Sequence, residues 1–177
     1  MLGGLEPVLR LSEAGNIDLA RASDLTTDSM SALGVQVKDL NRYLDIVAQS
    51  QKKANTSADG LMEAYIGCGG TLKNLNVPLE ESATWLGVLA NRGIKASEAG
   101  NGFNSVLVNI MGTSGQAKDA LATLGVSAWD ADENFKGIEG TLRELDSALK
   151  SCTEAQRNQF TAMIGGKTQM DVLNALL

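Results

Sequence analysis

The sequence predicts a mainly α-helical protein, a compact bundle of about seven short helices with one small β-hairpin. Apolar residues recur at helical spacing along most of the chain, and 19 glycines interrupt the apolar segments. Aromatic residues make up only 4% of the sequence, so aliphatic side chains must form most of the core. With 177 residues the chain can bury a substantial core. We expect a single helical domain over residues 1–177, as a fragment of a longer chain.

The helical spacing is clear between residues 19 and 33. Leu19, Ala22, Thr26, Met30 and Leu33 lie three or four residues apart, which places them on one face of a helix. Similar stripes occupy residues 37–48, 79–90, 99–110 and 138–149. Each stripe predicts a helix that packs one apolar face against its neighbours.

Several residues mark helix starts. Ser57 and Thr153 can accept a backbone N–H as N-caps, and Pro78 suits a first helical position, where its missing N–H costs nothing. Ser97 and Ser114 are further candidate N-caps.

Three helices are predicted to end in the same way, at Leu33-Gly34-Val35, Leu75-Asn76-Val77 and Leu124-Gly125-Val126. Glycine and asparagine tolerate the left-handed backbone that closes a helix, and the valine can fold back on the last turn. The segments between these ends do not align well, so a true repeat is disfavoured.

The segment 126–137 lacks a helical stripe, and its acidic and amide residues favour a turn. We therefore predict a β-hairpin there. Asp130, Asp132 and Asn134 have the spacing of the first half of a calcium loop. However, Phe135 and Thr141 stand where such a loop needs glycine and glutamate, so a turn is favoured over a calcium site.

Composition excludes several classes of function. The absence of histidine excludes Ser-His-Asp and Cys-His catalysis and any histidine-ligated metal centre. The net charge of −6 argues against a general nucleic-acid binder. Cys68 and Cys152 are predicted to be buried, inert thiols. We expect no signal peptide, because charged residues interrupt positions 1–20, and no membrane span.

Two glycine-containing patterns have a packing interpretation. Gly166-Lys167-Thr168 is like the end of a phosphate-binding loop, but Thr161 replaces the first glycine and a helix precedes it, so a helix end is favoured. Gly60, Ala64 and Cys68 repeat small side chains every four residues, which lets two helices approach closely. In a chain of this composition we expect that approach to be intramolecular.

The segment 77–100 opens with an acidic helix start and ends in the pattern Leu-Ala-x-x-Gly-Ile-Lys-x-Ser-x-Ala-Gly. It resembles the hallmark stretch of phage tail tape-measure proteins. Its motif positions are Leu89, Ala90, Gly93, Ile94, Lys95, Ser97, Ala99 and Gly100. The opening segment 14–34, the acidic turn 130–135 and the segment 164–167 resemble the family in the same order; the last adds Gly166 and Lys167 to the motif.

The resemblance implies a structural protein of a phage or prophage tail, with no enzymatic activity and no cofactor. Tape-measure proteins are long helical chains that set tail length, occupy the tail tube during assembly and leave ahead of the DNA. The implied locations are the host cytoplasm before assembly and then the lumen of the virion tail. The implied partners are tail-tube, tail-tip or baseplate and tail-assembly chaperone proteins, or further copies of the chain. The resemblance allows transient contact with the host membrane and implies no sequence-specific nucleic-acid binding.

Three alternatives stay open. The small residues at positions 60, 64 and 68 also suit a membrane-active or self-associating helical module that aids envelope penetration. A cell-wall hydrolase module is disfavoured by the absence of histidine and of a paired-acid motif. A self-interaction module outside any phage is the third alternative.

Overall fold

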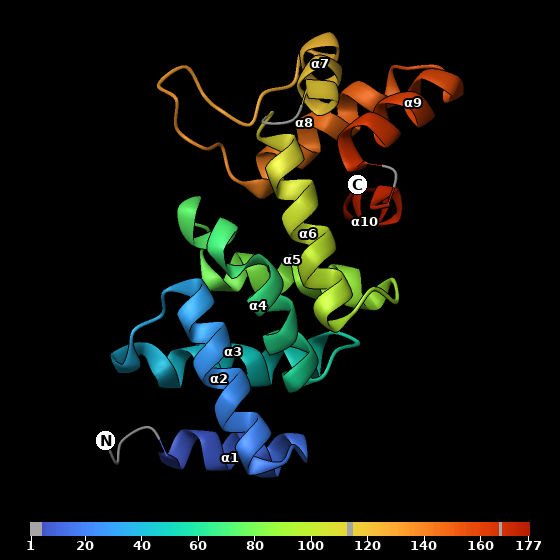
Figure 1. Ribbon diagram of the computed structural model, residues 1–177. Helices are drawn as coiled ribbons and strands as arrows, with labels where there is room; N and C mark the ends of the chain where they lie inside the picture. Colours follow the sequence, from blue (N-terminus) through green and yellow to red (C-terminus); the bar gives the residue numbers. More distant parts are fainter. Residues whose placement is uncertain (1–4, 113–114, 167) are drawn as a thin grey trace. The chain divides into compact units, whose positions relative to one another are not determined.

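The computed structural model describes residues 5–112, 115–166 and 168–177, and within these ranges it contains ten α-helices, one 3₁₀ helix and no sheet (Figure 1). The chain divides into two compact units, Met1–Asn101 and Gly102–Leu177. The mainly helical fold class is thus confirmed. The single domain over residues 1–177 stays a prediction.

The described part of the first unit contains five complete α-helices, one 3₁₀ helix and the start of a sixth α-helix. They are α1 (Leu5–Gly15), α2 (Leu19–Leu33), η2 (Val37–Asp39), α3 (Leu40–Lys53), α4 (Ala58–Asn74) and α5 (Leu79–Asn91), followed by the first residues of α6 (Ala96–Ile110). The second unit contains the rest of α6, then α7 (Gly115–Leu124), α8 (Ile138–Lys150), α9 (Glu154–Gly165) and α10 (Met170–Leu176).

The prediction of about seven helices was too low. The short helices at both ends of the chain, α1 and α10, lie outside the predicted stripes. The seven residues of α10 make only two turns, too few for a repeated stripe to be visible in the sequence. Burial of Val172, Leu173 and Leu176 stabilises this helix instead, which is a tertiary effect that local periodicity does not report.

The predicted β-hairpin was wrong in extent. A single antiparallel bridge between Trp129 and Phe135 is the only strand pairing among the described residues. The carboxylate of Asp130 accepts the backbone N–H groups of Asp132 and Asn134, both at 2.9 Å, so a side chain supplies hydrogen bonds that a longer ladder would otherwise provide. The two aromatic rings pack edge to face with centroids 6.0 Å apart.

Helix α4 forms the centre of the first unit. Its buried residues include Tyr65, whose ring centroid lies 6.0 Å from that of Tyr43 in α3. Both tyrosines are fully buried, and their hydroxyl groups are satisfied inside the core: that of Tyr43 donates to Ser29 at 2.6 Å, and that of Tyr65 lies 3.2 Å from the Ser82 hydroxyl. The polar pairs therefore connect α3 to α2 and α4 to α5 without leaving a buried hydroxyl unpaired.

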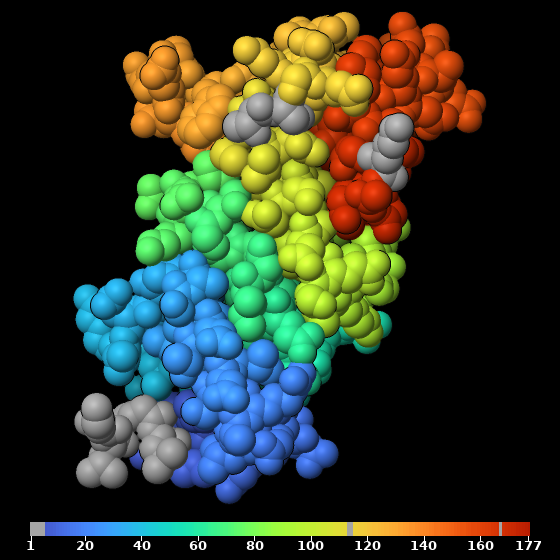
Figure 2. All heavy atoms as spheres, in the orientation of Figure 1, coloured from blue at the N-terminus to red at the C-terminus, as the bar shows by residue number. Residues whose placement is uncertain are grey.

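The most extensive helix contact in this unit joins α2 and α4, whose surfaces meet in Figure 2. Gly69 makes the contact close, because a Cβ atom there would lie 2.9 Å from the backbone carbonyl carbon of Ala32. At the other end of the same pair, Arg21 of α2 forms ion pairs with Glu63 and Asp59 of α4. The absence of a side chain at Gly69 thus sets how near the two helices lie.

Five helices end with the same hydrogen-bond pattern. In each, a residue with positive φ follows the last turn, and the next residue donates its backbone N–H to the carbonyl five positions earlier. The positive-φ residues are Asn16, Gly34, Asn76, Gly93 and Gly125, and the donors are Ile17, Val35, Val77, Ile94 and Val126, at 2.9–3.0 Å. The three predicted ends are confirmed, and two more were missed.

The helix starts agree in part with the sequence. Ser57 caps α4 through the N–H of Gly60, and Thr153 forms a capping box with Gln156 at the start of α9. Pro78 is the residue before the first turn of α5 rather than within it. Helix α6 begins at Ala96, before the predicted cap Ser97, while Ser114 lies outside the described residues.

The core of the second unit includes buried apolar residues of α6 and of α8. Phe103, Val106 and Leu107 of α6 are fully buried, as are Leu145 and Leu149 of α8. This stripe of α8 is the one that the sequence predicted over residues 138–149, with charged residues on the opposite face.

Only one of the two cysteines is fully buried. Burial raises the pKa of the Cys68 thiol to about 12, whereas Cys152 is partly exposed, contrary to the prediction that both are buried. Cys152 differs because it follows the end of α8 rather than lying inside a helix.

We therefore expect one fast-reacting thiol in the folded chain. A disulfide reagent at about pH 8 should modify Cys152 quickly and Cys68 only after denaturant is added, because only an accessible thiolate reacts. A Cys152→Ser variant is the control and should lose the fast phase. Fast modification of two thiols per native chain would contradict the burial of Cys68.

Candidate functional site

The described residues contain no group of three Cys, Asp or Glu side chains that could hold a metal ion. The strongly shifted titratable groups are the buried Tyr43, Tyr65 and Cys68, whose pKa values burial raises. The two tyrosines hydrogen-bond to serines within the core, and the thiol of Cys68 contacts the carbonyl of Ala64 in its own helix. These groups therefore serve packing, and the functional candidates are surfaces and helix contacts.

The acidic turn at residues 130–135 has a structural explanation. The hydrogen bonds that the Asp130 carboxylate accepts from the backbone of Asn134 and Asp132 hold its pKa below the ordinary value. Both bonds end on the same carboxylate oxygen, Oδ1, so the Asp130 side chain closes the turn. The predicted turn is thus confirmed. The indole N–H of Trp129 donates to the carbonyl of Met111, which joins the turn to the end of α6.

Gly166 ends α9, with φ of +76° and its N–H donating to the carbonyl of Ala162. The side-chain amide of Asn109 in α6 donates to the carbonyl of Ile164 at 2.8 Å, so this helix end is held against α6. A helix end therefore occupies the position of the phosphate-loop pattern, as the sequence favoured. Lys167, the other predicted motif residue here, lies outside the described residues.

The motif at residues 89–100 connects α5 to α6. Leu89 and Ala90 are buried in the last turn of α5, and Gly93 takes a φ of +91° directly after it. Ile94 then donates its N–H to the carbonyl of Leu89 at 3.0 Å and is itself buried. The first half of the motif is therefore a helix stop with its apolar contact.

The second half of the motif begins α6. Lys95 and Ser97 are exposed, and the carbonyl of Lys95 accepts the N–H of Ala99 at 3.2 Å. Ala99 is buried, and Gly100 lies directly against α4: a Cβ atom at position 100 would lie 2.1 Å from the carbonyl oxygen of Ala64. Only glycine fits at this contact.

Helix α4 contributes its own small residues to the same contact. A Cβ atom at Gly67 would lie 3.0 Å from the backbone of both Gly100 and Asn101. The small side chains at positions 60, 64 and 68 therefore face other parts of the first unit, as predicted. This internal use removes the observation that suggested a membrane-active helix. In the described ranges, no helix has both the length and the apolar content needed to cross a membrane.

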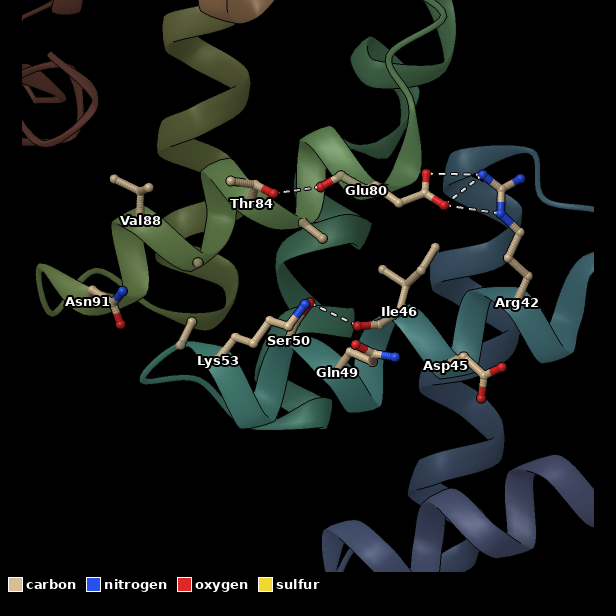
Figure 3. A pocket seen from close by; sticks show the side chains of 13 residues that line it. Arg42, Asp45, Ile46, Gln49, Ser50, Lys53, Glu80, Thr84, Val88 and Asn91 are labelled. Atoms are coloured by element: carbon tan, nitrogen blue, oxygen red, sulfur yellow. Dashed lines mark hydrogen bonds and ion pairs between the residues drawn. The ribbon is translucent and has the colours of Figure 1, made fainter.

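The described part of the first unit has several surface grooves, and one of about 450 Å³ lies between α1 and α3. Two others are larger. The first lies between α3 and α5, has a volume of about 680 Å³, and is shown in Figure 3. The second, of about 690 Å³, lies along α2 between α1 and η2. Its lining is apolar and includes Val8, Leu19, Met30 and Val37, the last of which is 78% exposed.

Helices α3 and α5 run parallel along the first groove. At one end, Arg42 holds the Glu80 carboxylate with contacts of 2.7 and 3.0 Å, which keeps the pKa of Glu80 below its usual value. At the other end, the backbone N–H of Asn55 donates to the Asn91 side chain at 2.8 Å. These residues were not predicted as a site, since two helices that are far apart in sequence form the groove.

Together these features define a helical protein whose motif residues end helices and bring them close together. Residues 1–166 match the sequence profile of the phage-related minor tail proteins, and the chain belongs to this family.

Two relatives agree with the family match. The chain is 25% identical to the tape measure protein of Pneumococcus phage Dp-1 over 177 residues, which are all of this chain and 15% of that protein. It is 30% identical to the probable tape measure protein of Escherichia phage P2 over 175 residues, 93% of this chain and 22% of that protein. The resemblance to tape-measure proteins is thus confirmed, although the chain spans less than a quarter of either relative. No solved structure matches the chain.

We expect Gly100→Ala to destabilise the chain by about 1–3 kcal/mol, because its methyl group would overlap the backbone of α4. Gly70→Ala is the matched control: Gly70 is exposed in α4 with no neighbouring atom within 4 Å, so helix propensity alone should stabilise this variant by about 0.5–1 kcal/mol. Urea unfolding measures the free energy of unfolding of both variants. Equal changes in the two variants would contradict the close contact at Gly100.

The turn should loosen in acid. Because the folded-state pKa of Asp130 is lowered, its stabilising effect is complete above the ordinary value of 3.8 and is lost as the pH falls through the lower folded-state pKa. In a Trp85→Phe background, Trp129 fluorescence should report this change at constant far-UV circular dichroism. Asp130→Ala should show the loosened state at neutral pH. Identical titrations of the two proteins would disprove the role of the carboxylate.

Proposed function

We propose that this chain is a compact helical module of a tape-measure protein, the protein that sets tail length, occupies the tail tube during assembly and takes part in DNA ejection. The observation that carries the proposal is the similarity to two tape measure proteins over nearly the whole chain. The helical fold agrees with it, since a helical chain has a fixed rise of about 1.5 Å per residue and can act as a ruler.

Within the ruler protein, we assign this segment a docking role rather than the role of an extended rod. A continuous helix of this length would span about 270 Å. Instead, five helices end at left-handed residues, and in the first unit α4 packs against α2 and the start of α6 through glycine contacts. Such contacts exist only while the segment is folded.

The proposed partners are tail-tube, tail-tip or baseplate and tail-assembly chaperone proteins, or further copies of the chain. The groove along α2 supports this role, since it leaves the apolar side chains of Val37 and Leu19 open to a partner. The proposed locations are the host cytoplasm before assembly and then the lumen of the tail. In this proposal, residues 1–177 form one helical domain of a longer chain.

Tail length tests the docking role. In a phage that encodes this chain, an in-frame deletion of the segment should shorten the tail by much less than about 270 Å, because a folded module spans less than an extended helix. The control replaces the segment with a glycine-free helical sequence of equal length, which should lengthen the tail. Electron micrographs measure both. A shortening by the full 270 Å would show that the segment is itself an extended part of the ruler.

A further inference from the structure

The groove between α3 and α5 carries opposite charges toward its two ends. The bidentate Arg42–Glu80 pair neutralises itself, which leaves two lining charges, Asp45 and Lys53. Neither forms an ion pair with another residue that the structure describes. They lie eight residues apart on α3, about 12 Å along the axis, so they cannot neutralise each other at contact distance.

Charged residues near the groove add to this separation of negative and positive charge. Asp39 and Glu81 lie near the starts of α3 and α5, where Lys38 offsets one of the two negative charges, whereas Lys52 and Arg92 lie at the helix ends. Because the two helices are parallel, one end of the groove has a net negative charge and the other a net positive charge. The partial negative charges of both helix C-termini also lie at the end that carries Lys53.

The groove has the dimensions of a helix site. Its lining follows one face of each helix over about three turns, roughly 16 Å from Arg42 to Lys53. The half-buried side chain of Ile46 lies between the charged ends (Figure 3). Gly87 brings α5 close to the end of α3, since a Cβ atom there would lie 3.1 Å from that of Ala54. An apolar floor between opposite charges suits an amphipathic helix.

We propose that this groove binds an amphipathic helix of a partner protein that has acidic residues in its first turn, an apolar stripe of small or aliphatic side chains, and basic residues in its last turn. The helix lies antiparallel to α3 and α5. Its acidic start pairs with Lys53, and its basic end pairs with Asp45. The positive end of its dipole then faces the negative ends of α3 and α5. This inference rests on the proposed docking role and names the surface that performs it.

A charge-swap experiment tests the direction of binding. The probe is a fluorescent synthetic helix of roughly five turns in which the central three turns match the groove: two glutamates open this part, leucine and alanine form one face, and two lysines close it. A second peptide has the charges reversed. Fluorescence anisotropy at low ionic strength should show that the 177-residue chain binds the first peptide more tightly, by about fivefold or more for the two ion pairs.

Three variants make the test specific. Lys53→Glu should weaken binding of the first peptide, whereas Lys52→Glu, the same charge change at a residue that does not line the groove, should weaken it less. The double variant Asp45→Lys with Lys53→Asp should invert the preference between the two peptides. Far-UV circular dichroism checks that these exposed substitutions leave the fold intact.

Equal binding of both peptides, no binding of either, or an unchanged preference in the double variant would overturn the proposal. A stable dimer that blocks the peptide and dissociates in the double variant would also overturn it, because a second copy of the chain would then be the occupant. None of these outcomes depends on tail assembly. Failure here therefore leaves the tail-length experiment as the separate test of the proposed function.

Discussion

The close approach of backbones to α4 is the constraint on which the first unit depends. Gly69 brings α2 near on one side, and Gly67 with Gly100 brings the start of α6 near on another. At these distances side chains other than hydrogen would overlap backbone atoms, so the helix positions follow from the glycine positions. The two buried tyrosines then fill the space beside this contact, and their serine partners fix α2 and α5 in turn.

Local sequence signals predicted much of the fold. The stripe over residues 138–149 and the capping residues Ser57 and Thr153 correspond to observed helices, because each depends on a few neighbouring residues. The stop at Asn16 was missed although it has the same chemistry as the stop at Asn76: a left-handed residue followed by a β-branched one. A search for glycine or asparagine followed by any β-branched residue, rather than by valine alone, would have found it.

Long-range features could not be predicted in the same way. The small residues of α4 indicated a close contact, but the sequence did not reveal that Gly100 forms its other side. The groove between α3 and α5 is also invisible in a linear pattern, since its two walls come from helices that are far apart in sequence. The extent of the hairpin depended on one carboxylate, Asp130, which takes the hydrogen bonds that strands would share.

The helix stops have a consequence for how such a chain can change in evolution. Each stop satisfies its backbone groups within six neighbouring residues, as at Leu89 and Ile94, so it needs no distant partner to form. Residues inserted just after such a helix end leave the preceding helix intact. The entropic cost of loop closure rises only slowly as the connection becomes longer. Genes built from these self-contained pieces can gain or lose whole helices while the remaining ones keep their shape.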